Sequence, residues 1–381
     1  MKLAEPTKFN RKSWGAQSRD LQFHWTPLHT VLTSANLHET IASRYGVHVR
    51  RSPDWKGSQM SPSRREFTRS IGTLAALAPF RRAAHAFSGT TCPFRLSVIN
   101  DEITEDFGRA CEIAAKDFGL RWIELRGMWN KNLTDLDEKE LADARRLLEK
   151  YQLQVTDIAS PLFKVDWPGA PLSKSSPKRD QFHAGFDFKQ QDQLLERCVE
   201  LAKVFQTDRI RCFDFWRLDD QGPYRAAIND KLRTAAETCA RSQLILLLEN
   251  EMSCNTATGE ESAAVLRAIP NRNLMLNWDP GNAAALGSTP YPDGYRLLPH
   301  DRIGHCHVKD VQRQPGKKYE WAPVGAGVVD WVGQFRALAK DGYHYAVSLE
   351  THWRGAGTPE ASTRISMQGL KGTLAKAGIT C

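Results

Sequence analysis

Short apolar runs alternate with one-sided amphipathic segments along residues 94–377. The short runs predict strands, and segments with apolar residues at i, i+3 and i+4, such as EKELADARRLLEKY, predict surface helices. The expected strands are 94–99, 121–126, 153–159, 209–213, 243–249, 274–279, 303–308 and 345–350. The expected helices are 104–118, 136–150, 190–206, 225–241, 259–269, 291–298, 330–340 and 360–377.

Eight alternating strand–helix units favour a single α/β domain, a (β/α)8 TIM barrel over 90–381, rather than an open doubly wound sheet. No GxGxxG motif follows the first expected strand, so the usual sign of a dinucleotide-binding fold is missing. Two long connections, 161–188 and 311–328, are rich in Pro, Gly and Lys. We expect them to form lids or substrate walls at the catalytic rim of the barrel.

The net charge of +8 is confined to the first part of the chain. Residues 1–90 hold 14 of the 52 basic and 5 of the 44 acidic residues, which leaves 38 basic and 39 acidic residues in 91–381. The barrel is therefore close to neutral, which argues against a nucleic-acid partner. The eight cysteines form no CxxC pair and no regular spacing. We expect reduced, buried thiols rather than a disulfide framework or a zinc ribbon.

Residues 60–86 have the composition of a twin-arginine export signal. Arg64-Arg65 precede a modestly apolar stretch of about 11 residues, too short for a stable membrane span, and Ala84-His85-Ala86 resembles a cleavage site. The mature protein would begin near Phe87 in the bacterial periplasm, with the export machinery as a partner. Residues 1–59 are expected to be a disordered leader or a mis-annotated start. A basic surface helix at the signal and a small N-terminal domain before it are the alternatives.

Four strings in the last third place acidic or imidazole side chains at expected strand ends: LLLENE, LNWDPGN, GHCHVKD and VSLETHW. Their key residues are Glu249, Asp279, His307 and Glu350, spaced as successive βα units. In a closed barrel these ends share one rim. Three carboxylates and an imidazole converging there would repel one another unless a divalent cation lay between them.

These strings resemble the sugar isomerase/epimerase family with the xylose isomerase-like TIM barrel, over about residues 94–377. The resemblance implies one divalent metal bound by Glu249, Asp279, His307 and Glu350. Oxygen-rich ligands suit Mn²⁺ first, with Mg²⁺, Co²⁺ or Zn²⁺ as alternatives. It also implies that Glu249 and Glu350 act as an acid/base pair on a sugar or polyol, through an enediolate. His305 is expected to pack behind His307.

Further residues are candidates for substrate contact. They are Glu124, Arg211, Glu251, Asn282, Lys309, Asp310 and Trp353, and structural ion pairs or packing under a loop remain the alternatives. Asn282 stands where epimerases often carry a histidine, and endonuclease IV needs that histidine for its three zinc sites. A nuclease is therefore disfavoured.

The competing functions are a keto-inositol or keto-sugar dehydratase and a non-catalytic sugar-binding barrel. The sequence leaves the substrate and the oligomeric state, including a homo-oligomer, open.

Overall fold

Eight parallel strands form the centre of the computed structural model, which describes residues 92–171, 173, 182, 184–313 and 319–381. They are β1 (Arg95–Val98), β2 (Trp122–Leu125), β5 (Gln154–Ile158), β6 (Arg209–Cys212), β7 (Ile245–Glu249), β8 (Leu274–Trp278), β9 (Ile303–Val308) and β12 (Ala346–Leu349). The sheet order is β1-β12-β9-β8-β7-β6-β5-β2. A parallel bridge between Ile99 and Glu124 links its two ends. The sheet is thus a nearly closed barrel, as the sequence predicted.

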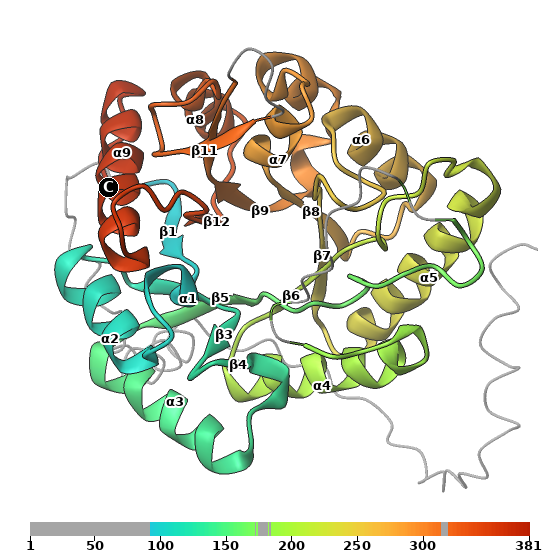
Figure 1. The fold of residues 1–381 in the computed structure, drawn as a ribbon, viewed down its shortest axis with the longest axis horizontal. Helices are drawn as coiled ribbons and strands as arrows, with labels where there is room; N and C mark the ends of the chain where they lie inside the picture. Colours follow the sequence, from blue (N-terminus) through green and yellow to red (C-terminus); the bar gives the residue numbers. More distant parts are fainter. Residues whose placement is uncertain (1–91, 172, 174–181, 183, 314–318) are drawn as a thin grey trace, which may run out of the picture. The chain divides into compact units, whose positions relative to one another are not determined.

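Helices surround the ring of strands (Figure 1). They are α2 (Phe107–Glu112, continued by a π turn at Ile113–Asp117), α3 (Glu138–Tyr151), α4 (Gln191–Val204), α5 (Gly222–Arg241), α6 (Gly259–Ala268), α8 (Trp331–Lys340) and α9 (Pro359–Lys376). Leu141, Ala144 and Leu148 of α3 are buried while its charged face meets solvent. The apolar stripe read from the sequence therefore packs against the barrel.

One expected helix, 291–298, is wrong. The chain instead forms a short helix directly after β8, α7 (Pro280–Ala285), followed by π and 3-10 turns at Pro290–Gly294 and Tyr295–Leu297. Tyr291 is extended, with φ −127° and ψ 134°. Pro290 and Pro292 lack the N–H group that a continuous helix needs, so the chain turns rather than coils.

Short helical turns and strands lie at the rim formed by the carboxyl ends of the barrel strands. A helical turn, α1 (Asn100–Ile103), follows β1, and two antiparallel ribbons pair β3 (Gly127–Met128) with β4 (Lys131–Asn132) and β10 (Asp310–Gln312) with β11 (Glu320–Ala322). The second ribbon lies in the expected connection 311–328. Within the described ranges, no helix is both long and apolar enough to cross a bilayer.

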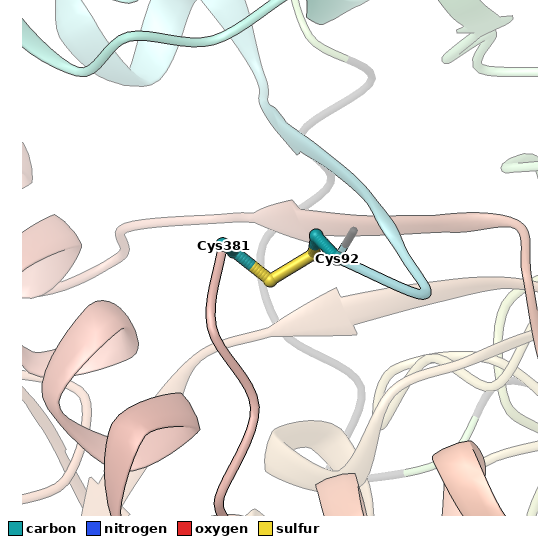
Figure 2. The surroundings of a disulfide bond; sticks show 2 residues. All are labelled: Cys92 and Cys381. Atoms are coloured by element: carbon teal, nitrogen blue, oxygen red, sulfur yellow. A yellow bond between two sulfur atoms is a disulfide. The ribbon is translucent and has the colours of Figure 1, made fainter. Parts of the chain in front are cut away.

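A disulfide joins Cys92, just before β1, to Cys381 at the end of the chain (Figure 2). The expectation of reduced thiols throughout is wrong for this pair, because residues 289 positions apart become neighbours only when the barrel closes. Cys111, Cys198, Cys212, Cys239, Cys254 and Cys306 are free and buried, as predicted. The expected leader and export signal, residues 1–59 and 60–86, lie outside the described residues.

Candidate metal centre and active site

Four neighbouring strands deliver the four side chains that the sequence singled out. Glu249 ends β7, Asp279 directly follows β8, His307 is the penultimate residue of β9, and Glu350 directly follows β12. β7, β8, β9 and β12 are adjacent in the sheet. One possible ligand atom from each side chain lies within 4.8 Å of the others, and all four side chains are buried. The barrel thus brings the predicted set together.

His307 lies at the centre of this group. Its Nδ1 is 3.3 Å from Glu249 Oε1, 3.4 Å from Glu350 Oε2 and 3.8 Å from Asp279 Oδ2. Glu249 Oε2 and Asp279 Oδ2 form no hydrogen bond among the described residues, but each lies near a cation: Arg211 Nη1 is 3.3 Å from Glu249 Oε2, and Lys309 Nζ is 2.8 Å from Asp279 Oδ2. Buried carboxylate oxygens that converge in this way are the ligands that a hard divalent cation prefers. The donor set of three carboxylates and one imidazole suits Mn²⁺, Mg²⁺, Co²⁺ or Zn²⁺.

Lys309 supplies positive charge to the same carboxylates. Its Nζ is 2.8 Å from Asp279 Oδ2 and 2.5 Å from Glu350 Oε2. Burial disfavours the charged ammonium, but the surrounding carboxylates hold the pKa of Lys309 well above its ordinary value. Lys309 is therefore a buried cation that contacts two of the four candidate ligands.

The carboxylates differ in how readily they ionise. Burial raises the pKa of Asp279 to about 6, even though Lys309 opposes this shift. Burial also favours a higher pKa for Glu249, but His307 and Arg211 outweigh this effect and lower its pKa to about 2. The effect of burial is also outweighed at Glu350. Lys309, His352 and His307 hold the pKa of this carboxyl group well below its ordinary value. Glu249 and Glu350 are thus the carboxylates held ionised, as bases must be.

Glu124 lies beneath the cluster, fully buried in the barrel interior. Its Oε1 is 3.0 Å from His307 Nε2 and its Oε2 is 3.1 Å from His305 Nε2. Asp157 Oδ1 lies 3.4 Å from the other nitrogen of His305. An Nε2–H of His307 that donates to Glu124 leaves Nδ1 free to face the carboxylates. Glu124 was predicted to contact substrate, with an ion pair as the alternative, and the structure shows it in contact with the two histidines. His305 packs against His307, with ring centroids 5.2 Å apart.

Arg211 and Asn282, both predicted to contact substrate, hold Glu249. Arg211 donates to the carbonyl oxygens of Ala159 and Ser160, and its Nη1 lies 3.3 Å from Glu249 Oε2. Asn282 Nδ2 donates to Glu249 Oε1 at 3.3 Å. A guanidinium and an amide therefore fix the direction of this carboxylate.

Arg126 and His352 hold Glu350, and sequence reasoning did not assign either to the site. Arg126 Nη1 donates to Glu350 Oε1 at 3.1 Å, and His352 Nε2 lies 3.1 Å from the same oxygen. The position of Arg126 directly after β2 was an available signal, because it parallels that of Asp279 and Glu350 after their strands.

The remaining substrate candidates have contacts at the rim. Glu251 accepts from the Ser253 amide and hydroxyl, and its other oxygen is 3.5 Å from Lys164 Nζ. Asp310 accepts from the backbone amides of Val311, Gly325, Gly327 and Val329, so its carboxylate organises the loop before α8. Trp353 is half-buried, with its indole ring against Gly355. Among the described residues, neither Asp310 nor Trp353 forms a hydrogen bond or ion pair with the four-residue cluster.

Comparison with known proteins agrees with this architecture. The chain is similar to the putative L-ribulose-5-phosphate 3-epimerase SgbU of Escherichia coli K12, with 25% identity over 214 residues, which cover 52% of this chain and 73% of SgbU. Among solved structures it resembles the probable 3-DHS dehydratase AsbF of Bacillus anthracis, with 21% identity, a TM-score of 0.55 and coverage of 73% and 98% of the two chains. It also resembles the IOLI protein solved with a bound zinc atom, with 15% identity, a TM-score of 0.57 and coverage of 75% and 98%.

The two structural likenesses establish the fold alone. The model of the xylose isomerase-like TIM barrel family matches residues 113–373, which include all four candidate ligands. This chain is a member of the xylose isomerase-like TIM barrel family.

Proposed function

We propose that this protein is a metal-dependent sugar or polyol isomerase or epimerase that moves a proton next to a carbonyl. The observation that carries the proposal is the buried group of Glu249, Asp279, His307 and Glu350, whose ligand atoms lie within 4.8 Å of one another. The relative SgbU, whose name specifies a sugar-phosphate epimerase, supports the reaction class. A non-catalytic sugar-binding protein would not require this ligand set.

The four residues would hold one divalent cation, with Mn²⁺ the first choice. When bound, the cation would supply positive charge to stabilise the oxygens of an enediolate. Glu249 and Glu350 come from the two outer strands of the four, β7 and β12. One carboxylate takes the proton from the carbon beside the carbonyl, and the other returns a proton to the opposite face. His307 and Arg211 keep Glu249 ionised, and Lys309, His352 and His307 do the same for Glu350. Arg126 orients Glu350 by a hydrogen bond to Oε1.

A dehydratase is the second candidate function, because Lys309 places an ammonium group 2.5 Å from Glu350. After Glu350 removed the α-proton, Lys309 could donate a proton to a β-hydroxyl group, which would leave as water. The carbon–oxygen bond would break and a carbon–carbon double bond would form, with no net oxidation. Product analysis separates the two reactions, because only the dehydratase releases water from the sugar.

Glu350→Gln tests the proton chemistry. The change keeps the size of the side chain but removes the base, so turnover should fall about 10²–10⁴-fold. Wild-type protein loaded with Mn²⁺ and incubated in D₂O with a panel of ketoses, ketose phosphates and inosose should place deuterium beside the carbonyl. Elemental analysis of both proteins separates loss of metal from loss of the base.

Glu112→Gln is the matched control, since Glu112 pairs with Lys116 on the exposed face of α2. Full turnover without solvent deuterium would leave Glu249 and Glu350 as ligands only. Wild-type protein that binds no divalent metal would refute the site.

We also propose export to the periplasm by the twin-arginine route, for which residues 60–86 supply the signal. The Cys92–Cys381 disulfide supports this location. Disulfides persist in oxidising compartments such as the periplasm and are rare in the cytosol.

A further inference from the structure

A cavity of about 720 Å³ opens beside the metal centre, at the same rim of the barrel. Its walls come from the segments after β1, β2 and β12 and from the start of α9. Thr104, Arg126, Arg354, Ala361 and Arg364 line it, together with Phe182 from the connection after β5. The volume lies within the range of small-molecule binding sites. None of the four candidate metal ligands lines it, so it is additional space next to the reaction centre.

Arg126 lies between the cavity and the reaction centre. Its Nη1 donates to Glu350 Oε1 at 3.1 Å, while its Nη2 donates to Glu102 Oε1 at 2.7 Å and its Nε to Asp101 Oδ1 at 3.0 Å. One side chain therefore separates the cavity from a proposed catalytic base. A substrate that reacts at Glu350 could extend past Arg126 without leaving the protein.

The charges of the lining are balanced. Arg354 donates to Glu102 at 2.6 Å, and Arg364 lies 2.6 Å from Asp117 and 2.9 Å from Glu360. Arg126 is already engaged by three carboxylates. Each arginine of the described lining therefore has an acidic partner, whereas recognition of a phosphate favours cations that have none.

The same groups suit a neutral polyhydroxylated ligand. Carboxylates and guanidinium groups that pair with each other keep further acceptor and donor positions, which hydroxyl groups can use. Phe182 and Ile103 add apolar surface. The C–H face of a sugar ring can pack on such surface while its hydroxyl groups reach the charged residues.

We propose that this cavity binds a second sugar ring, so that the substrate is a keto-disaccharide or a glycoside with the carbonyl in its reacting ring. The proposal rests on the proposed function, which places the reacting ring at Glu249 and Glu350. A second sugar ring would distinguish this substrate from a free ketose. The arginines of the lining already have acidic partners, which argues against a ketose phosphate.

The test compares keto-disaccharides with their ketose unit on the full chain loaded with Mn²⁺. Affinities for lactulose, palatinose, D-fructose and ribulose 5-phosphate are measured by saturation-transfer NMR, which requires no turnover. At least one keto-disaccharide should bind 10-fold or more tightly than fructose and ribulose 5-phosphate. Equal affinities, or a preference for the phosphate, would overturn the proposal.

Ala361→Trp should fill the cavity from the first turn of α9 and weaken keto-disaccharide binding at least 10-fold, with fructose binding and metal content unchanged. Thr104→Trp fills it from the opposite segment and provides an independent variant. Ala142→Trp, on the exposed face of α3, is the matched control. Unchanged disaccharide affinity in both folded cavity variants would refute the second subsite.

Deuterium exchange separates this proposal from the proposed function. If fructose acquires deuterium but disaccharides show no preference, only the second subsite is wrong. If the cavity variants lose disaccharide binding but the wild-type protein exchanges no deuterium on any sugar, the subsite stands and the proposed proton chemistry is wrong.

Discussion

At the scale of single residues, the site depends on charged groups that are buried beneath and beside the candidate ligands. Glu124 is the clearest example, because it accepts from the far nitrogen of His307 and contacts His305 as well. A carboxylate in this position fixes both the ring orientation and the nitrogen that faces a metal. The role of a buried polar residue is thus set by the side chain that it contacts.

Glu124→Gln should lower Mn²⁺ affinity about 10–100-fold, the usual effect of losing such a partner. The amide keeps the shape of the side chain but removes the negative charge behind the imidazole. Competition with a fluorescent chelator measures the affinity, and Glu112→Gln again serves as the exposed control. An affinity equal to that of the wild type would show that Glu124 does not orient His307.

Asp101 gives the stability of the protein a dependence on pH. Burial raises its pKa from 3.8 to about 6, although Arg126 opposes the shift. Between these values the folded state binds more protons than the unfolded state, so this residue makes stability fall as pH rises from about 4 to 6. A shift of this size corresponds to roughly 3 kcal/mol.

Asp101→Asn should remove this fall. Urea unfolding at pH 4, 5, 6 and 7 should show the wild type losing roughly 3 kcal/mol relative to the variant, and most of the loss should occur below pH 6. Asp230→Asn, on the exposed face of α5, controls for the substitution itself. Parallel curves for wild type and Asp101→Asn would contradict the assignment.

At the scale of elements, one residue of the DPGN string, Asp279, is both the N-cap of a helix and a candidate metal ligand. Asp279 precedes α7, and its Oδ1 accepts from the Asn282 amide at 2.9 Å as a helix N-cap. Pro280 fits the first helical position because its missing N–H is not needed there. The cap uses one carboxylate oxygen and leaves Oδ2 facing the cluster.

Gly281 lets α7 approach Lys309, which directly follows the strand that carries His307. A Cβ at this position would lie 2.5 Å from Lys309 Cγ and 2.9 Å from the Lys309 carbonyl oxygen. Gly281→Ala should therefore cost about 1–3 kcal/mol by overpacking and weaken metal binding, as followed by chemical denaturation and metal titration.

Gly372→Ala is the matched control, because nothing lies within 4 Å of a Cβ there. Since Gly372 is inside α9, the change should be neutral or stabilise by about 0.5–1 kcal/mol. If Gly281→Ala behaved in the same way, the close approach of α7 would not matter for the site.

At the scale of the whole molecule, the Cys92–Cys381 disulfide connects the start of the barrel to its last residue. Export and disulfide formation should therefore occur together. In cells making the wild type, alkylation and non-reducing mass spectrometry should find this disulfide in the periplasmic fraction. Replacement of Arg64-Arg65 by Lys-Lys should retain the protein in the cytoplasm with both thiols reduced.

A Cys381→Ser variant should be exported like the wild type but lack the cross-link, which separates the two effects. Unchanged export of the Lys-Lys variant would contradict the twin-arginine proposal. Reduced thiols in periplasmic wild-type protein would contradict the disulfide.

The sequence by itself determined the barrel and its four principal side chains. Strand and helix periodicity is a local property, so the eight strands of the barrel and the amphipathic α3 could be predicted from neighbouring residues. Because parallel strands end at one rim, the order of Glu249, Asp279, His307 and Glu350 also predicted their convergence. The turns at Pro290–Gly294 were not predicted, because the spacing of apolar residues there resembled that of a helix despite the two prolines.

Only the tertiary structure decided which other groups meet this cluster. Arg126 contacts Glu350 across 224 positions, Glu124 contacts His307 across 183, and Cys92 reaches Cys381 across 289. Such contacts follow from barrel closure, which places β2 across the barrel interior from β9 and Cys92 beside Cys381. Side-chain direction and burial then set whether a charged residue binds substrate, holds a ligand or lines the neighbouring cavity, and sequence spacing carries no record of them.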